Sequence, residues 1–215
     1  FETIPSQVDA EDPVAVGSML ADSMARAGID PGPAVFALDR SITSLKRLTL
    51  PTDDPDELPD MVRLAVEREL PIDAEDAVID FSIIDRGADG FVVETVAVPR
   101  REIERIERIA DAAGMRVARV APRCHGAMRL ADSTEPTLVL DVTGEGFELG
   151  LVDHGRLRWS RGVSIEGADP GGPTAEELVP EIRRSWLSYR VSAGEIETPM
   201  LLILGGEQIA DVVGG

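Results

Sequence analysis

Residues 138–162, LVLDVTGEGFELGLVDHGRLRWSRG, decide the fold that we expect for this chain. An apolar strand ends at Asp141, and a turn with glycines at 144 and 146 follows it. A second strand, a His-Gly hairpin at 154–155 and a third strand come next, which predicts a three-stranded meander. Glycine turns can hold a phosphate on backbone N–H groups, so the first turn is either a phosphate loop or an ordinary hairpin corner.

The elements that follow the meander are a helix and an apolar strand. Residues 175–192 predict the helix, and its apolar residues are spaced three, four and three apart: Val179, Ile182, Trp186 and Tyr189. We interpret the two aromatic residues as core anchors rather than as part of a cofactor site. The apolar strand of residues 200–204 is typical of a sheet that is covered on both faces.

The N-terminal half predicts a helix, two strands and an inserted unit. The helix covers residues 14–27, and the strands cover 33–39 and 44–51. Residues 52–60, TDDPDELPD, form an acidic connector that indicates a subdomain boundary. The order after it is α-β-β-α-β, at residues 60–70, 77–85, 91–99, 100–113 and 115–122. This order predicts a compact ferredoxin-like sheet with its helices on one face.

Composition excludes several classes of function. The chain has 215 residues and a formal net charge of −19, which disfavours nucleic acid and anionic membranes as partners. Lys46 is its only lysine, and no Gly-Lys-Ser/Thr stretch is present, which excludes a P-loop. No apolar run approaches the roughly 20 residues of a membrane helix, and no signal peptide opens the chain, so we expect a segment that is soluble by itself.

Cysteine and histidine are too few for most metal sites. Cys124 is the only cysteine, so it forms no internal disulfide, and we expect it to pack near a helix start. His125 and His154 are the only histidines, whereas a zinc site needs four ligands at suitable spacing, so we predict no metal site. Counting leaves a Ser-His-Asp triad open, but no Gly-x-Ser-x-Gly elbow supports one.

The meander, helix and Gly-Gly strand end together resemble half of an actin-like lobe. LTLP (48–51), the inserted unit, AGMRVARVAP (113–122) and GVSIEG (162–167) extend the resemblance to the PilM family of type IV pilus assembly. The cytoplasmic domain of GspL, from type II secretion, is similar in plan. The resemblance implies an α/β fold of partial actin-like (ribonuclease H-like) lobes with an inserted ferredoxin-like subdomain. It divides the chain into a partial first lobe (1–52), the inserted subdomain (53–122) and a second lobe without most of its helical insertion (123–215).

The resemblance also implies a degenerate nucleotide site. Asp141 matches the aspartate of the family's second phosphate loop, which lies near the metal and phosphates. Thr143 stands at the glycine position, with Gly144 one place later and Gly146 beyond it. Phe147 replaces the residue that supplies a hydroxyl. Gly205 and Gly206 match the pair that contacts adenosine, but nothing before Val14 supplies the first phosphate loop. We therefore expect no cofactor, and ATP with Mg²⁺ is the alternative.

The function that the resemblance implies is that of a non-catalytic cytoplasmic adaptor. Its partner would be the cytoplasmic tail of a PilN-like platform protein, bound near residues 44–51, with Arg47, and 60–70. A motor ATPase is a further expected partner, and association with the inner membrane would come through partners. One alternative is an ATP-binding ATPase or kinase relative, so enzyme activity stays open. Another is the cytoplasmic head of a membrane-anchored GspL-like protein.

Overall fold

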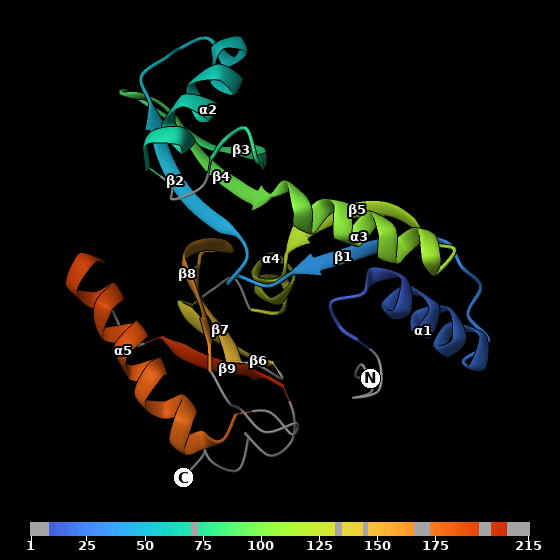
Figure 1. The fold of residues 1–215 in the computed structure, drawn as a ribbon. Helices are drawn as coiled ribbons and strands as arrows, with labels where there is room; N and C mark the ends of the chain where they lie inside the picture. The colour runs from blue at the N-terminus through green and yellow to red at the C-terminus, as the bar shows by residue number, and fades with distance from the viewer. Residues whose placement is uncertain are drawn as a thin grey trace. The chain divides into compact units, whose positions relative to one another are not determined.

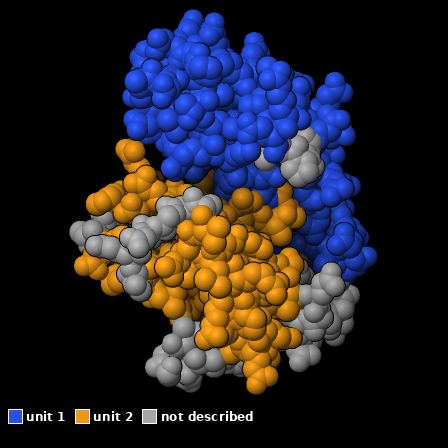
Figure 2. Space-filling view, turned by 90° about the vertical axis from the view of Figure 1, so that its left-hand side faces the viewer, with its two compact units in different colours: residues 1–37, 43–121 blue, residues 38–42, 122–215 orange. Residues whose placement is uncertain are grey.

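The computed structural model describes residues 9–69, 73–131, 135–143, 146–165, 173–193 and 199–205. The chain divides into two compact units, which Figure 2 colours separately. Unit 1 comprises Phe1–Ala37 and Thr43–Ala121, and unit 2 comprises Leu38–Ile42 and Pro122–Gly215. The short segment Leu38–Ile42 therefore belongs to unit 2, although the chain on either side of it belongs to unit 1.

The larger sheet of unit 1 has three antiparallel strands in the order β2-β4-β3 (Figure 1). Its elements are β2 (Ser44–Leu50), the 3-10 turn η1 (Pro55–Glu57), α2 (Leu58–Glu69), β3 (Ala77–Gly87) and β4 (Gly90–Pro99). Leu48 and Leu50 alternate along β2 and so face the same side of the sheet. They pack in one core cluster with Val62 and Val66 of α2 and Val93 of β4. The amphipathic helix α2 thus covers one face of this sheet.

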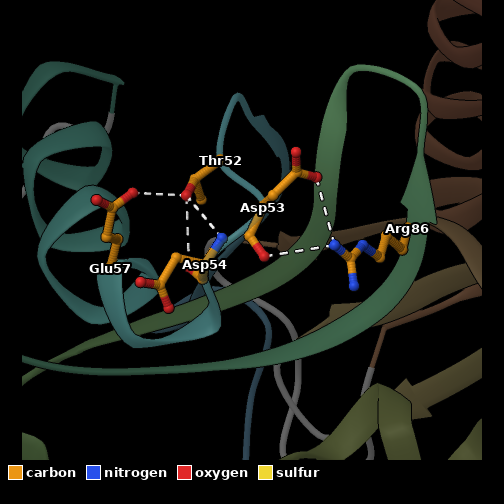
Figure 3. Close-up of polar contacts among 5 residues, drawn as sticks. All are labelled: Thr52, Asp53, Asp54, Glu57 and Arg86. Atoms are coloured by element: carbon orange, nitrogen blue, oxygen red, sulfur yellow. Dashed lines mark hydrogen bonds and ion pairs between the residues drawn. The ribbon is translucent and has the colours of Figure 1, made fainter.

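Polar contacts hold the turn that leads into α2 (Figure 3). The Thr52 hydroxyl accepts the N–H of Asp54 at 3.0 Å and donates to the Glu57 carboxylate at 2.5 Å. Arg86, from β3, reaches both the carbonyl oxygen and the carboxylate of Asp53 at 3.4 Å. These contacts give two acidic residues of the predicted connector, Asp53 and Glu57, a structural role in the turn before α2.

The smaller part of unit 1 pairs two strands and two helices. They are α1 (Pro13–Arg26), β1 (Pro33–Leu38), α3 (Arg100–Ala112) and β5 (Arg116–Pro122), with β1 paired to β5. Helix α1 crosses α3 at Gly17, where a Cβ atom would lie 2.5 Å from the Ile109 carbonyl oxygen. The same atom would lie 2.6 Å from the Ala112 Cβ. Only glycine therefore permits this close crossing of the two helices.

Strand pairing corrects the ferredoxin-like sheet expected for residues 53–122. The element order α-β-β-α-β is present, but β5 pairs with β1, and the third strand beside β4 is β2. The physical reason is the apolar face of α3. Ile106 and Ile109 are buried on this face, and it packs on α1 around Gly17. That packing takes the chain out of the first sheet before β5 begins. Strand β2, which the predicted division assigns to the first lobe, lies in the same sheet as β4 of the predicted inserted subdomain. The three-part division stays a prediction.

Unit 2 is built on a four-stranded sheet in the order β8-β7-β6-β9. Its elements are α4 (Arg123–Ala127), η2 (Met128–Leu130), β6 (Thr137–Thr143), β7 (Gly146–Asp153), β8 (Arg156–Ser164), α5 (Ala175–Ala193) and β9 (Met200–Leu204). Strands β6, β7 and β8 form the predicted antiparallel meander, and β9 lies parallel to β6. Strands β7 and β8 are joined by the tight turn at His154 and Gly155, with φ of 49° and 70°, as the His-Gly pair predicts.

Helix α5 packs on this sheet through Ile182, Trp186 and Tyr189 of its predicted apolar stripe, with Leu178 rather than the predicted Val179 in the core cluster. Trp186 and Tyr189 join the core cluster of β6 and β7, and Leu178 is 2% exposed. The Tyr189 ring centroid lies 5.1 Å from that of Trp159 in β8, so both aromatic residues are core anchors as predicted. The expectation that β9 is covered on both faces is wrong, because Met200 and Leu201 are 51% and 46% exposed. Strand β9 lies at an edge of the sheet, with β6 on one side of it.

Candidate functional site

The structure brings together most of the residues that the sequence placed at a nucleotide site. Asp141 and Thr143 end β6, and Gly205 follows directly after β9. Because β6 and β9 are parallel neighbours, with Asp141 opposite Leu204, their carboxyl ends meet at one edge of the sheet. Ligands of open α/β sheets bind at such an edge. Two of the predicted residues, Gly144 and Gly206, lie outside the described residues.

Close backbone packing accounts for two of these glycines. A Cβ atom at Gly146 would lie 2.0 Å from the carbonyl oxygen of Val163 in β8. Gly205 has a φ of 133°, and its Cβ atom would lie 3.1 Å from the Val142 Cβ. A side chain is therefore excluded at Gly146 by β8 and disfavoured at Gly205 by its backbone conformation, whether or not a ligand binds nearby.

Asp141 forms an ion pair with an arginine of the same unit. The Nε of Arg123, the first residue of α4, donates to the Asp141 carboxylate at 2.7 Å, and the two side chains are 31% and 14% exposed. The hydrogen bond to Asp141 raises the pKa of Arg123, and the carboxylates of Glu148 and Asp39 act in the same direction. The carboxylate that the resemblance places near a metal is thus engaged by a cation of the chain itself.

Glu148 is a buried carboxyl beside this ion pair. It lies on β7, directly opposite Asp141, and is 3% exposed. One of its oxygens accepts the backbone N–H of Arg40 at 2.6 Å, and the other has no hydrogen-bond partner among the described residues. Burial raises the pKa of Glu148 to about 7, assisted by Asp39 and Asp141 and opposed by the Arg40 N–H and the Arg123 guanidinium.

Segment Leu38–Ile42 lies on β7 and β8 and meets Glu148 there. The Arg40 guanidinium donates to the Ser160 hydroxyl at 3.1 Å, in addition to the backbone bond to Glu148. A Cβ atom at Gly162 would lie 2.8 Å from the Arg40 Cβ and 2.9 Å from the Ser41 N. Glycine at 162 therefore provides the space in which this segment crosses the sheet.

Sequence reasoning missed Arg40, Arg123, Glu148 and Gly162. The available signal was Glu148 itself, a charged residue at an inward position of the otherwise buried strand β7. Its partner could not be read locally, because Arg40 lies 108 residues away along the chain. Cys124 is buried at the start of α4, as predicted.

The chemistry of this corner is electrostatic. Two guanidinium groups and three carboxylates interact through hydrogen bonds and charge where the end of β6 lies beside the start of β7. Within the described ranges, no group of three or more His, Cys, Asp and Glu side chains could hold a metal ion. What the described geometry does is hold segment Leu38–Ile42 and α4 to one sheet.

Known proteins were compared with the chain through sequence and through structure. No protein-family model and no curated protein matches it. A chain of the PilM–PilN type IV pilus biogenesis complex matches with a TM-score of 0.80 and 19% identity, over 99% of this chain and 77% of that one. The cytoplasmic domain of EpsL, an inner-membrane component of the Vibrio cholerae type II secretion system, matches with a TM-score of 0.58 and 18% identity, over 91% and 72%.

The description of a third solved structure that matches the chain includes its fold. It is a Bacteroides thetaiotaomicron protein of unknown function described as having an actin-like ATPase fold, with a TM-score of 0.50 and 8% identity, over 99% of this chain and 74% of that one. The chain has an actin-like ATPase fold. This confirms the resemblance inferred from the meander, the helix and the Gly-Gly strand end, at the level of the fold. None of the helices that the structure describes is both long enough and apolar enough to cross a membrane.

Proposed function

We propose that this chain is a non-catalytic adaptor of a type IV pilus or type II secretion platform at the inner membrane. The observation that carries the proposal is the match to a chain of the PilM–PilN complex over 99% of this chain at a TM-score of 0.80. The likeness to the EpsL cytoplasmic domain supports the same cellular setting, on the cytoplasmic side of the membrane. The adaptor binds the cytoplasmic tail of a platform membrane protein and, through it, serves a motor ATPase.

The ion pair at Asp141 supports a role without catalysis. Arg123 already neutralises this carboxylate at 2.7 Å, so the corner is held together by the chain's own charges. A chain whose corner is assembled in this way has no need of nucleotide to order it. The proposed adaptor therefore works through its surfaces.

The tail site that we propose lies in unit 1, on β2 and α2. The side chains of Leu48 and Leu50 face α2, which leaves Arg47 and Thr49 on the opposite, exposed face of β2. Lys46 joins the strand to the helix through an ion pair with Glu69. The proposed site therefore presents a polar strand surface with a cation at its centre, suited to an extended tail that carries an acidic residue.

Peptide binding tests this proposal. Labelled peptides that span the N-terminal cytoplasmic residues of candidate platform proteins are titrated with the chain, and binding is followed by fluorescence anisotropy. We expect one of them to bind saturably and Arg47→Glu to weaken its binding at least about tenfold, a loss of about 1.4 kcal/mol. Arg156→Glu, at an exposed position of unit 2, is the control and leaves the affinity unchanged. Failure of every platform peptide to bind would contradict the proposal.

An ATP-binding relative is the second candidate, because the ends of β6 and β9 lie side by side with Gly205 against Val142. Calorimetric titration with ATP and Mg²⁺ distinguishes the two candidates. Tight, saturable binding that Asp141→Ala abolishes would favour the ATP-binding candidate over the adaptor. The likeness to EpsL also favours a GspL-like head, which requires an apolar segment of about 20 residues elsewhere in the same gene product.

A further inference from the structure

Helix α5 carries apolar side chains on two opposite faces. The inner face packs on the sheet of unit 2 through Leu178, Ile182, Trp186 and Tyr189. On the other side, Leu187 is 59% exposed and Val191 is 88% exposed. These two residues are four apart and so lie next to each other on one helix surface. A surface helix ordinarily has one apolar stripe and a polar opposite face, so the second apolar pair calls for an explanation.

The second face is also basic. Arg183 and Arg190 are exposed and, at spacings of four and three, flank Leu187 on the same side of the helix. We name Arg183, Leu187, Arg190 and Val191 the α5 outer face. Residues 182–193 contain three arginines and no Asp or Glu. The third, Arg184, pairs with Glu181 of the preceding turn at 2.7 Å.

Charge sets this face apart from the rest of the chain. The whole chain has 40 acidic and 21 basic residues, for a formal net charge of −19. Arg184 is paired with Glu181, so Arg183 and Arg190 supply the basic character of the α5 outer face, around the exposed side chains of Leu187 and Val191. Such a surface complements a partner that has apolar side chains flanked by acidic ones.

We propose that the α5 outer face docks an acidic amphipathic segment of a partner protein. The site is separate from the proposed tail site, which lies on β2 and α2 in unit 1. The net charge of −19 opposes the approach of nucleic acid and of an anionic membrane, because both bring a dense array of negative charge near the acidic remainder of the chain. A second copy would bring another 19 negative charges. A short acidic segment contacts the α5 outer face alone and brings little negative charge near the rest of the chain.

Two designed peptides test the proposal. Each is a labelled 20-residue amphipathic helix with the same leucine stripe, and the polar face is Glu in one and Lys in the other. Anisotropy titrations at low and at physiological salt measure their binding. We expect the Glu peptide to bind saturably and to weaken as salt rises. The α5 variants are Arg183→Glu with Arg190→Glu, and Leu187→Ser with Val191→Ser.

A matched control variant lies elsewhere in unit 2. Arg129→Glu with Leu130→Ser changes an exposed arginine and a leucine that is 64% exposed on η2. Circular dichroism and the Trp fluorescence of unit 2 confirm that all variants are folded. We expect each α5 variant to weaken Glu-peptide binding at least tenfold, and the η2 variant to leave it unchanged. Binding of the Lys peptide to the acidic remainder of the chain is not weakened in either α5 variant.

Three results would overturn the proposal. The Glu peptide does not bind, or it binds equally well to the α5 variants, or its binding is lost only in the η2 control. Phosphatidylglycerol vesicles and sedimentation velocity complete the experiment. Vesicle binding or self-association that the α5 variants abolish, without Glu-peptide binding, would assign the face to a membrane or to a second copy instead. Binding of the platform tail peptide to β2 and α2 is measured in a separate titration. If that peptide fails to bind, the Glu-peptide result on the α5 outer face still stands.

Discussion

Glu148 places a carboxyl group in the interior of unit 2, where burial opposes its ionisation. Its side chain is 3% exposed, and burial raises its pKa to about 7 from the ordinary value of 4.5. A raised pKa means that the folded state binds a proton more tightly than the unfolded state does. The stabilisation from this group is therefore complete below pH 4.5 and is lost as the pH rises through 7.

Glu148→Gln should remove this part of the pH dependence. The change in pKa corresponds to a loss of about 3 kcal/mol in the free energy of unfolding between pH 4.5 and pH 8. The variant keeps the side-chain shape without a titrating proton, so its stability falls less over that range. Urea unfolding followed by Trp159 and Trp186, both in unit 2, measures it. An exposed control, Glu176→Gln, should keep the wild-type slope; equal slopes in all three proteins would contradict the assignment.

The Arg123–Asp141 pair should be energetically coupled more strongly than a surface pair. Both side chains are partly buried, so removing one partner leaves the other charge poorly solvated. A double-mutant cycle with alanine should give a coupling of about 1–2 kcal/mol. The control is Arg158–Asp153, a 3.0 Å pair on the neighbouring hairpin, for which we expect less than about 1 kcal/mol. A first cycle no larger than the second would show that the Asp141 corner is not held by Arg123.

At the scale of elements, segment Leu38–Ile42 is attached to its sheet by a few identifiable contacts. These are the Arg40 N–H to Glu148, the Arg40 guanidinium to Ser160, and the close approach over Gly162. Loss of one of these contacts should speed the exchange of the segment's amide protons. Gly162 lies in the sheet beneath the segment, so a side chain at this position would push against the segment.

Gly162→Ala should loosen the segment. The new Cβ would lie 2.8 Å from the Arg40 Cβ and 2.9 Å from the Ser41 N, so the segment must lift or the sheet must bend, at a cost of about 1–3 kcal/mol. Hydrogen exchange read by mass spectrometry should show faster exchange in peptides that contain residues 38–42. Gly150→Ala, in the same sheet, is the control, because its Cβ would meet Leu157 at an ordinary 3.4 Å. Unchanged exchange in the Gly162 variant would show that the segment is held by other contacts.

Local patterns predicted the elements, and long-range contacts decided how they pair. The apolar strand that ends at Asp141, the glycine turn after it and the His-Gly turn are local features, so the meander followed from residues 137–164. The partner of β5 depends on how α3 packs on α1, where Gly17 meets Ile109, 92 positions further along the chain. The site shows the same limit: Asp141 was found through a motif, whereas the partners of Glu148 come from segments remote in the chain.

At the scale of the whole molecule, charge and fold act together. A net charge of −19 with a pI near 4.4 means that the native chain repels itself increasingly as the pH rises. Raising the pH therefore destabilises this protein in two ways, through general repulsion and through the buried Glu148 carboxyl. The two effects have the same sign, but they differ in their response to salt, because salt screens exposed charges much more than buried ones.

Salt should separate the two effects. At 0.5 M NaCl we expect the free energy of unfolding of the wild type to rise at pH 8 and to change little near pH 4.4, where the net charge is close to zero. The pH dependence that remains at high salt should belong mainly to Glu148, since its desolvation is not screened. Glu148→Gln in 0.5 M NaCl should consequently show a nearly flat profile from pH 5 to pH 8, measured by urea unfolding with Trp fluorescence. A residual slope equal to that of the wild type would mean that other buried groups of unit 2 titrate in this range.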